Sequence, residues 1–577
     1  MKRRSLLALL AVPLAVSTSV VAAVVALPSA VAAPALSGKT VEYSVLGKDG
    51  VDVNAVAGAV RTAGGTVVRS NAAAGLLTAT APANGFTARL ASAAEVLYAS
   101  RTISIGDAPR KKAAADQDAV EKENKAGAGG RGKAKPAPVG MDPLDGQLWG
   151  LTSVRSDLAR TEQPGDKRVK VGILDTGVDG SHPDIAPNFD AGLSRNFTHD
   201  IPVDENGNTV DGPCEFRGCV DPANWDDGGH GTHVAGTIAA AVNGVGVSGV
   251  APNVSIVNIR GGQDSGSFFL QPVVDALTYA GDAGLDVVNM SFFVDPWLYN
   301  CQANSADSPE QQAQQRTIVT AMTRAMNYAD RKGVTQVVSL GNGHEDNGAP
   351  HDDTTSPNFP VDTAHDRVID NASCLSMPIE GPHTIGVAAY GPSGAKADYS
   401  SYGLEQISVS APGGYFRDYF GTPRFRANEN LILSTYPRNV GVAEGAIDDA
   451  TGEVTPDGVE LGVQKACKAG KCGYYQFLQG TSMAAPHASG VAALIVAEYG
   501  KYTGKGVSMN PDKVARVLEG TAFAIPCPTP RTVDYLDEGR DDSFTATCAG
   551  DTELNGFYGN GAVDAWAAVT NGNQYLS

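Results

Sequence analysis

Short apolar segments rich in β-branched residues alternate with helical stretches from about Gln147 to the end of the chain. Each apolar segment is five or six residues long and is bounded by turn residues, as in buried strands. This alternation predicts an α/β fold with a mainly parallel sheet and helices on both faces, so reactive side chains are expected at the carboxyl ends of the strands. The expected strands are Val169–Leu174, Ser255–Ile259, Asp286–Met290, Thr335–Ser339 and Thr384–Ala388, and the expected helices are Val234–Ala241, Pro272–Ala280, Ala313–Asp330 and Pro486–Tyr499.

A second, smaller pattern precedes this region. Residues 40–105 read as strand, helix, strand, strand, helix and strand, which predicts a small α/β sandwich of about 65 residues. The expected strands are Val41–Leu46, Thr66–Ser70, Gly75–Ala81 and Val96–Ile105, and the expected helices are Val53–Ala63 and Asn84–Ser92. Residues 107–140 are then rich in Ala, Lys, Gly and Pro without an apolar period, which predicts a flexible, protease-accessible linker.

The first 33 residues have the pattern of a secretory signal peptide. Three basic residues follow Met1, an apolar stretch runs from Leu6 to about Leu27, and small residues come next. The predicted cleavage lies after Ala32 or Ala33. The alternative is a membrane anchor, but Pro13 and the polar residues 17–19 interrupt the apolar stretch. Other segments are not apolar enough to span a bilayer, so we expect a secreted, soluble protein.

Charge is distributed unevenly along the 577 residues. The whole chain carries a net charge of −19, but residues 1–140 hold 17 basic and 9 acidic side chains, a balance of +8, and the remainder has a balance of −27. An acidic body argues against nucleic-acid binding and against docking on anionic lipid. The opposite signs also favour attraction between the front of the chain and its body.

Eight cysteines agree with an oxidising destination. Cys214–Cys219 and Cys467–Cys472 have the same spacing, and each pair could close a small local ring. Cys301–Cys374 and Cys527–Cys548 are the simplest remaining disulfides. The alternative for the short pairs is metal binding, but no neighbouring Cys or His completes a zinc set.

Three polar motifs contain candidate catalytic residues. Asp175 directly follows the first expected strand of the large domain, His230 lies in the Gly-rich stretch Asp227-Gly-Gly-His-Gly-Thr-His, and Ser482 lies in Gly480-Thr-Ser-Met-Ala-Ala-Pro. Alone, each has an ordinary structural interpretation as a turn, a helix start or a cap. Together, in the order Asp, His, Ser, they point to nucleophilic catalysis.

At these motifs the sequence resembles the subtilase (subtilisin-like, peptidase S8) family of serine proteases over roughly residues 145–570. The resemblance implies that Ser482 attacks the peptide carbonyl, that His230 transfers the proton and that Asp175 orients His230. Asn342 matches the oxyanion-hole Asn of the family, with the Ser482 backbone N–H as the second donor. His233 and His487 are expected to be structural.

The resemblance also implies the domain organisation. A signal peptide at residues 1–33 precedes an inhibitory propeptide of the small α+β, ferredoxin-like type at 34–106, the linker at 107–140 and the subtilisin-like catalytic domain at 141–577. Residues 413–475 are expected to be a surface insertion. The cut that releases the enzyme is expected between Gly106 and Gly146.

Two stretches match the strands that flank an extended peptide substrate in the family. Where the family commonly has glycines, this chain has Phe293 and Val294, so Phe293 is expected to narrow the pocket for the residue before the cut. A rearranged loop, or two Phe side chains that belong to the core, are the alternatives. The substrate-binding residues implied are Ser265, Gly266, Ser291, Phe292, Phe293, Ser339, Leu340 and Gly341.

A calcium site is the one cofactor that the resemblance implies. Asp184 and Asn243 match family ligands, Asp145 lies near the position of another, and the carbonyls of Ala241, Val245 and Val247 would complete an oxygen shell. Val242 departs from the usual Asn pair. The acidic runs 200–227 and 350–370 are expected to be solvated insertions, although either could hold a second ion. No organic cofactor is expected.

These observations predict a secreted serine endopeptidase that is made as a self-processing zymogen. Its partners would be peptide or protein substrates and its own propeptide, and we expect a monomer. One alternative is a selective processing protease with a narrowed pocket. The other, from a different class, is an inactive relative that acts as a binding protein, against which the complete set of catalytic residues argues.

Overall fold

The computed structural model describes residues 35–102, 117–123, 142–204, 207–360, 363–503 and 506–577. The expected signal peptide and most of the expected linker lie outside these residues. Among the described residues, no helix has the length and apolar character needed to cross a membrane.

A seven-stranded parallel sheet forms the centre of the large domain, as the alternating pattern predicts. Its strand order is β15-β14-β10-β8-β5-β7-β6. The first of these strands in the sequence, β5, therefore lies inside the sheet, and later strands are added on both sides of it. The strands are β5 (Lys170–Leu174), β6 (Arg195–Asn196), β7 (Ser255–Arg260), β8 (Val287–Met290), β10 (Thr335–Ser339), β14 (Thr384–Tyr390) and β15 (Val409–Pro412).

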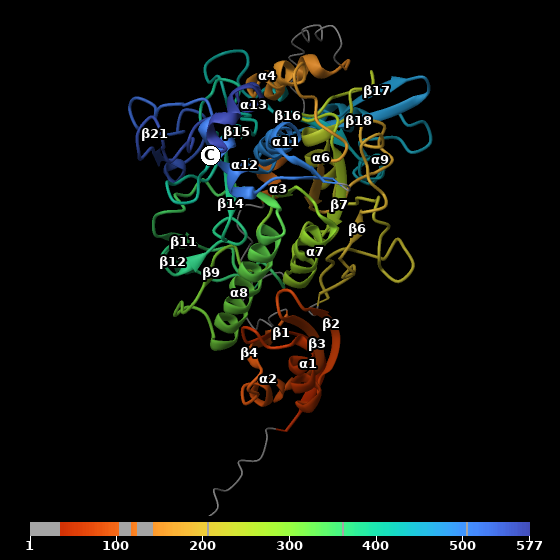
Figure 1. Ribbon diagram of the computed structural model, residues 1–577, viewed down its shortest axis with the longest axis vertical. Helices are drawn as coiled ribbons and strands as arrows, with labels where there is room; N and C mark the ends of the chain where they lie inside the picture. Colours follow the sequence, from red (N-terminus) through yellow and green to blue (C-terminus); the bar gives the residue numbers. More distant parts are fainter. Residues whose placement is uncertain (1–34, 103–116, 124–141, 205–206, 361–362, 504–505) are drawn as a thin grey trace, which may run out of the picture.

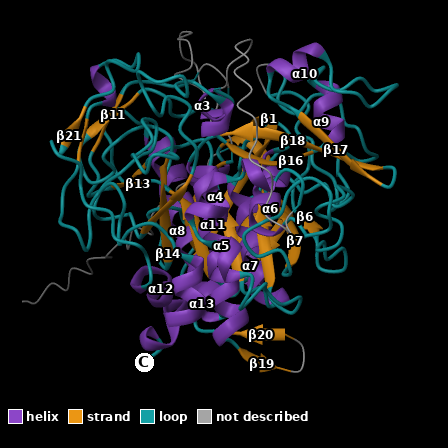
Figure 2. Cartoon of the chain, turned by 90° about the horizontal axis from the view of Figure 1, so that it is seen from above, coloured by secondary structure: helices purple, strands orange, loops and turns teal. Residues whose placement is uncertain are grey.

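Helices cover both faces of this sheet and bury a separate core on each. The side chains of successive strand residues point to opposite faces, so Val171 and Ile173 belong to one core and Leu174 to the other. One face packs against α6 (His230–Ala239), α11 (Thr481–Tyr499), α12 (Pro511–Gly520) and α13 (Ala565–Asn571), and the other packs against α7 (Leu270–Ala283) and α8 (Pro309–Arg331). Nearly all of α11 is buried, and the helix lies near the middle of the molecule (Figure 2).

The N-terminal unit has the predicted order of elements and an antiparallel sheet in the order β2-β3-β1-β4. This is the ferredoxin-like arrangement expected from the sequence. Its elements are β1 (Ser37–Gly47), α1 (Val53–Thr62), β2 (Thr66–Asn71), β3 (Leu76–Asn84), α2 (Phe86–Leu90) and β4 (Val96–Arg101).

The N-terminal unit lies against α7 and α8, at one end of the large domain (Figure 1). Leu46 and Leu76 from its sheet join the apolar core on that side. The Asn71 amide donates to Asp275 (2.8 Å) and Thr278 (2.7 Å), and the Arg324 guanidinium donates to the Gly47 carbonyl (2.9 Å). The contact therefore combines apolar burial with satisfied polar groups.

Residues 413–475, expected as a surface insertion, are more closely integrated than that. They supply much of a three-stranded antiparallel sheet of β16 (Ile432–Tyr436), β18 (Lys471–Leu478) and β17 (Gln464–Lys468), with α9 (Arg438–Ala443) and α10 (Pro456–Glu460) beside it. Nε2 of His233 on α6 lies 3.1 Å from the carbonyls of Ile432 and Gln476, so this sheet fixes the helix that begins at His230. Burial lowers the pKa of His233 to about 3, and that of His487 to about 4, as expected of structural histidines.

The four predicted disulfides, Cys214–Cys219, Cys301–Cys374, Cys467–Cys472 and Cys527–Cys548, are present. None of them lies in the central sheet: Cys301–Cys374 and Cys467–Cys472 each join the two strands of a smaller antiparallel pair. The remaining short elements are α4 (Trp149–Ser153), α5 (Ser156–Ala159), β9 (Asn300–Cys301), β11 (His351–Asp353), β12 (Arg367–Ile369), β13 (Cys374–Leu375), β19 (Lys501–Thr503), β20 (Gly506–Ser508), β21 (Thr532–Val533) and β22 (Ala546–Thr547).

Candidate active site

Asp175 follows the carboxyl end of β5 and faces the first residue of α6. Its Oδ1 lies 2.7 Å from Nδ1 of His230 and also accepts the Thr176 N–H (2.8 Å). Burial raises the pKa of Asp175, although the positive charge of His230 acts to lower it. The helix can begin this close only because residue 231 is Gly: a Cβ there would lie 2.1 Å from the Gly177 carbonyl oxygen.

The loop before His230 is held by Asp226, which the sequence analysis did not single out. One oxygen of its buried carboxylate accepts the N–H groups of Gly228 (3.1 Å) and Gly229 (2.9 Å), and the other accepts the Thr232 N–H (2.9 Å). These bonds satisfy backbone donors at the start of α6, so Asp226 orients His230 without touching it.

Ser482 and Asn342 lie together at the start of α11. Asn342 Oδ1 accepts the Thr481 N–H (2.9 Å), and this bond leaves its Nδ2 donor facing the site. The Ser482 hydroxyl lies 3.4 Å from the Ser291 carbonyl oxygen. Asp175, His230, Ser482 and Asn342, which the sequence placed in four separate motifs, therefore converge at one edge of the sheet.

A residue of the expected flexible linker also enters this site. Residues 117–121 form a short helix, α3 (Gln117–Glu121), so this part of the linker is ordered, contrary to expectation. Glu121 Oε2 lies 3.3 Å from His230 Nε2, and Oε1 accepts a hydrogen bond from Asn342 Nδ2 (3.2 Å). The Glu121 carboxylate thus occupies the two groups expected to perform proton transfer and oxyanion binding.

Glu121 and His230 form an ion pair inside the protein. Burial alone would raise the pKa of Glu121, but the His230 charge and hydrogen bonds from His230, Ser482 and Asn342 lower it overall. Burial alone would lower the pKa of His230, but the charges of Asp175 and Glu121 raise it well above its ordinary value. The ion pair therefore favours the protonated form of His230 while Glu121 is in place.

The neighbours of Glu121 in the chain are anchored by residues from three other segments of the chain. Gln479 donates its backbone N–H to the Glu121 carbonyl (3.1 Å) and its side-chain amide to the Val120 carbonyl (3.0 Å). Glu123 forms ion pairs with Arg540 (2.9 Å) and Arg417. These contacts hold residues 120–123 against the site.

A pocket opens beside Ser482 and Asn342. Six of the eight predicted substrate-binding residues line it: Ser291, Phe292, Phe293, Ser339, Leu340 and Gly341. Ser265 and Gly266 do not. They lie in a neighbouring turn. Phe268, just after this turn, stacks on Phe292 of the pocket wall with ring centroids 4.0 Å apart.

Glu345 is the one charged residue among those that line this pocket. Its Oε2 accepts the Tyr299 hydroxyl (2.5 Å) and lies 3.5 Å from His351 Nε2. Burial raises the pKa of Glu345, partly offset by the charge of His351 and the bond from Tyr299. The sequence analysis missed Glu345, although it lies only three residues after Asn342.

The residues predicted to bind calcium come together, but their oxygens are used within the protein. Asp184 Oδ2 accepts the Tyr475 hydroxyl (2.7 Å) and the Val247 N–H (3.0 Å), and Oδ1 accepts the Asn243 amide (3.0 Å). Asn243 Oδ1 accepts the Val245 N–H (2.8 Å), and the Lys468 ammonium donates to the Asn243 carbonyl (2.6 Å).

The Asp145 carboxylate also accepts hydrogen bonds from the protein: Oδ1 accepts the Ser248 N–H (2.8 Å) and Oδ2 accepts the Ser248 hydroxyl (2.5 Å). Calcium requires about six to eight oxygen ligands that face the ion. In this structure the side-chain oxygens of Asp145, Asp184 and Asn243 therefore accept hydrogen bonds from protein donors, and calcium binding by this set, with the carbonyls of Ala241, Val245 and Val247, stays a prediction.

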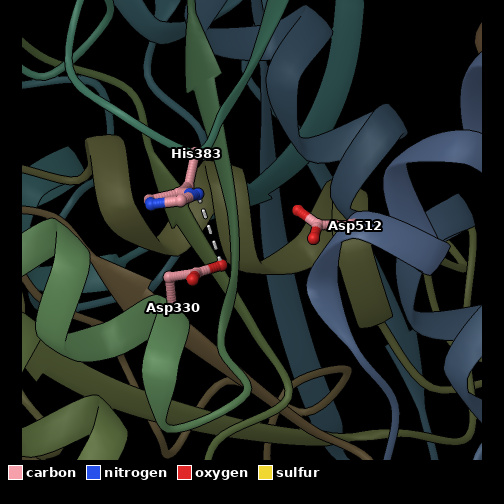
Figure 3. A group of neighbouring side chains, drawn as sticks. All are labelled: Asp330, His383 and Asp512. Carbon is pink, nitrogen blue, oxygen red and sulfur yellow. Dashed lines mark ion pairs between the residues drawn. The ribbon is translucent and has the colours of Figure 1, made fainter.

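Another group of possible metal ligands lies far from the triad. Asp330 at the end of α8, His383 before β14 and Asp512 in α12 come within metal-binding distance of one another (Figure 3). Asp330 and His383 form an ion pair (3.6 Å), and His383 and Asp512 are exposed. This group lies at the amino ends of the strands, away from Ser482, and an exposed acidic group of this kind is common without an ion.

Comparison with known proteins identifies relatives of this fold and site. Residues 166–561 match the subtilase family (peptidase S8). The chain is 28% identical over 391 residues to fervidolysin of Fervidobacterium pennivorans, covering 66% of this chain but only 41% of fervidolysin. It is 27% identical over 351 residues to subtilisin DY of Bacillus licheniformis, covering 61% of this chain and 85% of that protein.

Solved structures show the same fold. The epidermin leader peptide processing serine protease from Staphylococcus aureus superposes with a TM-score of 0.60 at 20% identity, covering 93% of this chain and 99% of that chain. The crystal structure of fervidolysin superposes with a TM-score of 0.54 at 23% identity, covering 92% of this chain and 61% of that chain.

Proposed function

The chain belongs to the subtilase family of serine endopeptidases, and from this premise we propose that it is secreted as a precursor and cleaves peptide bonds with Asp175, His230 and Ser482. The observation that carries the proposal is the 2.7 Å contact between Asp175 and His230 at the edge of the site where Ser482 and Asn342 lie. Labelling of the folded, mature chain at Ser482 by a fluorophosphonate tests it, and absence of labelling would contradict it.

The geometry supports a two-step acyl transfer. With His230 neutral, the Ser482 hydroxyl would transfer its proton to Nε2 while its oxygen bonds to the substrate carbonyl carbon. The Asn342 amide and the Ser482 N–H would stabilise the oxyanion. His230 would then give the proton to the leaving amine, and a water molecule would hydrolyse the acyl-enzyme by the same route. Asp175 would hold the His230 tautomer throughout.

We also propose that Glu121 keeps the precursor inactive. Its carboxylate binds His230 in the protonated form, which cannot accept the proton of Ser482, and it occupies the Asn342 donor needed by the oxyanion. The N-terminal unit, docked on α7 and α8, would act as the propeptide that holds this segment near the site. A cut within the linker would let residues 120–123 leave.

Replacing Glu121 with Gln is expected to speed fluorophosphonate labelling of the intact precursor by about tenfold or more, because a charge-assisted contact to His230 is lost. The pH dependence should change as well. The Glu121 charge raises the pKa of His230, so the pH midpoint of labelling should lie lower in the Glu121→Gln variant than in the wild-type precursor.

The measurement is the rate at which the intact precursor band is labelled between pH 5 and 10. Glu553→Gln, an exposed change far along the chain, serves as the control and should label like the wild type. An unchanged midpoint in the Glu121→Gln variant would show that Glu121 does not control His230.

A second candidate function, selective cleavage, is favoured by the pocket beside Ser482. Its lining is neutral except for the carboxylate of Glu345, and Phe292 and Phe293 form part of its wall. A partly buried carboxylate in such a pocket prefers a cationic side chain, since the attraction is strong where water is excluded. We propose cleavage after Lys or Arg.

Replacing Glu345 with Gln is expected to lower kcat/KM for peptides with Arg before the cut by about tenfold or more, and to leave that for Leu peptides unchanged. The ratio of the two kcat/KM values is the quantity to measure. Glu380→Gln, at a nearby half-buried carboxylate that does not line the pocket, is the matched control. A wild-type enzyme that prefers Leu would contradict the assignment.

A further inference from the structure

Two arginines of the large domain bind the linker residue Glu123 beside the active site. The Arg540 guanidinium lies 2.9 Å from Glu123 Oε2, and the Arg417 guanidinium forms an ion pair with Oε1. The Gln479 side-chain amide also donates to Oε2 (3.3 Å). Glu123 is two residues after Glu121, which contacts the catalytic histidine. A binding site for one carboxylate therefore lies a short stretch of chain away from the catalytic residues.

Contacts within the large domain hold this arginine pair, independently of the linker. The buried Asp398 carboxylate forms an ion pair with Arg540 and lies 3.6 Å from Nε of Arg417. Arg417 also donates to the Glu538 carbonyl (2.7 Å), and the Glu538 carboxylate accepts the Tyr415 hydroxyl. The two guanidiniums are therefore preorganised for a carboxylate, which costs less binding free energy than ordering them on arrival.

The charges around the arginine pair favour one further anion. A third guanidinium lies here, because Arg426 donates to the Glu538 carbonyl (3.3 Å). Even with Asp398 and Glu538 both ionised, these three cations keep one net positive charge when the linker leaves. The Arg417 and Arg540 side chains are only 11% and 16% exposed with the linker in place, so solvent screens the site less than an open surface.

The arginine pair lies past Ser482 from the loops expected to flank the substrate. Those loops follow β7 and β8, whereas Arg417 follows β15, the strand at the far end of the order β15-β14-β10-β8-β5. The Ser482 hydroxyl lies 3.4 Å from the Ser291 carbonyl after β8, and Gly480 donates to the Gly413 carbonyl after β15 (2.9 Å). A peptide that lies against β7 and β8 before the cut would therefore extend past Ser482 toward Arg417.

We propose, on the premise of the peptidase activity proposed above, that Arg417 and Arg540 of the mature enzyme bind an acidic side chain of the substrate on the carboxyl-terminal side of the cut. In the precursor Glu123 fills this site, and a Glu or Asp of the substrate takes its place once the linker leaves. With the Glu345 carboxylate in the pocket, the substrate class becomes peptides with a basic residue before the cut and an acidic residue shortly after it.

The test uses the mature enzyme and internally quenched peptides with Arg before the cut. Each peptide carries Glu or Gln at one of the first four positions after the cut, so each pair differs in charge but hardly in shape. We expect Glu to raise kcat/KM over Gln by about tenfold or more at one of these positions, since a charge-assisted pair with two guanidiniums forms there. Equal values at all four positions would overturn the proposal.

Arg540→Gln should bring this Glu-to-Gln ratio of kcat/KM close to one. Arg417→Gln repeats the test if Arg540→Gln does not fold. Arg516→Gln, at an exposed position of α12, is the matched control and should keep the wild-type ratio. A wild-type ratio in folded Arg540→Gln and Arg417→Gln variants would also overturn the proposal.

A binding measurement separates this proposal from the proposed peptidase activity. An amidated peptide of residues 117–123 should bind the mature chain, and Glu123→Gln in the peptide should weaken binding by about tenfold or more. The same change should have little effect on binding to Arg540→Gln. If Ser482 is not labelled and no peptide is cut, the peptidase proposal fails, and the binding measurement still decides the arginine site. Equal affinity of the wild-type chain for both peptides would then overturn it.

Discussion

Ser482→Ala is expected to lower kcat by about 10⁶-fold and to leave the signal-cleaved precursor uncut. A loss of that size is typical when the nucleophile of a Ser-His-Asp triad is removed, because no other group can form the acyl-enzyme. The residual rate would come from oxyanion stabilisation by Asn342 and from substrate binding. The two measurements are peptide hydrolysis by the purified chain and the length of the secreted product.

Ser543→Ala, an exposed serine in a short turn, is the matched control and should be processed normally. A Ser482→Ala precursor that is still cut at the wild-type position would show that another protease matures the chain. A folded Ser482→Ala variant with wild-type hydrolysis would contradict the assignment of the nucleophile. The two outcomes separate self-processing from catalysis.

The large domain and four of its site residues could be predicted because their signals are local. Short β-branched strands alternate with helices, and Asp175, His230, Asn342 and Ser482 each lie in a glycine-containing motif. Gly231 shows why such a motif is informative: only a residue without Cβ lets α6 begin against the loop after Asp175. Local backbone requirements of this kind restrict the residue type and can therefore be recognised in the sequence.

Glu121 could not be predicted from a local motif of this kind. It lies in a stretch without apolar periodicity, and its position depends on Gln479, Arg417 and Arg540, which are hundreds of residues away. The loop predicted to bind calcium is a similar case, since the Tyr475 hydroxyl that donates to Asp184 comes from 291 residues further along the chain. Which long-range partner satisfies a polar group is decided by the tertiary structure, so a match at the loop alone does not show which donors its oxygens accept.

Asn342→Ala is expected to lower kcat by about 100–1,000-fold in the mature enzyme, the usual effect of removing one oxyanion donor. The donor is directed by the Thr481 N–H, which holds Oδ1 and leaves Nδ2 facing the site. Because the amide would bond to charge that develops only in the transition state, kcat and kcat/KM should fall together while KM stays constant.

A positioning effect can be distinguished from a donor effect at the same site. The Thr481 hydroxyl also donates to Asn342 Oδ1 (2.9 Å), so Thr481→Ala removes one orienting bond but keeps the backbone N–H and the amide donor. We therefore expect Thr481→Ala to cost much less in kcat than Asn342→Ala. Equal losses would mean that orientation of the amide, rather than its hydrogen bond to the oxyanion, limits the rate. A rise in KM alone in Asn342→Ala would place Asn342 in substrate binding instead.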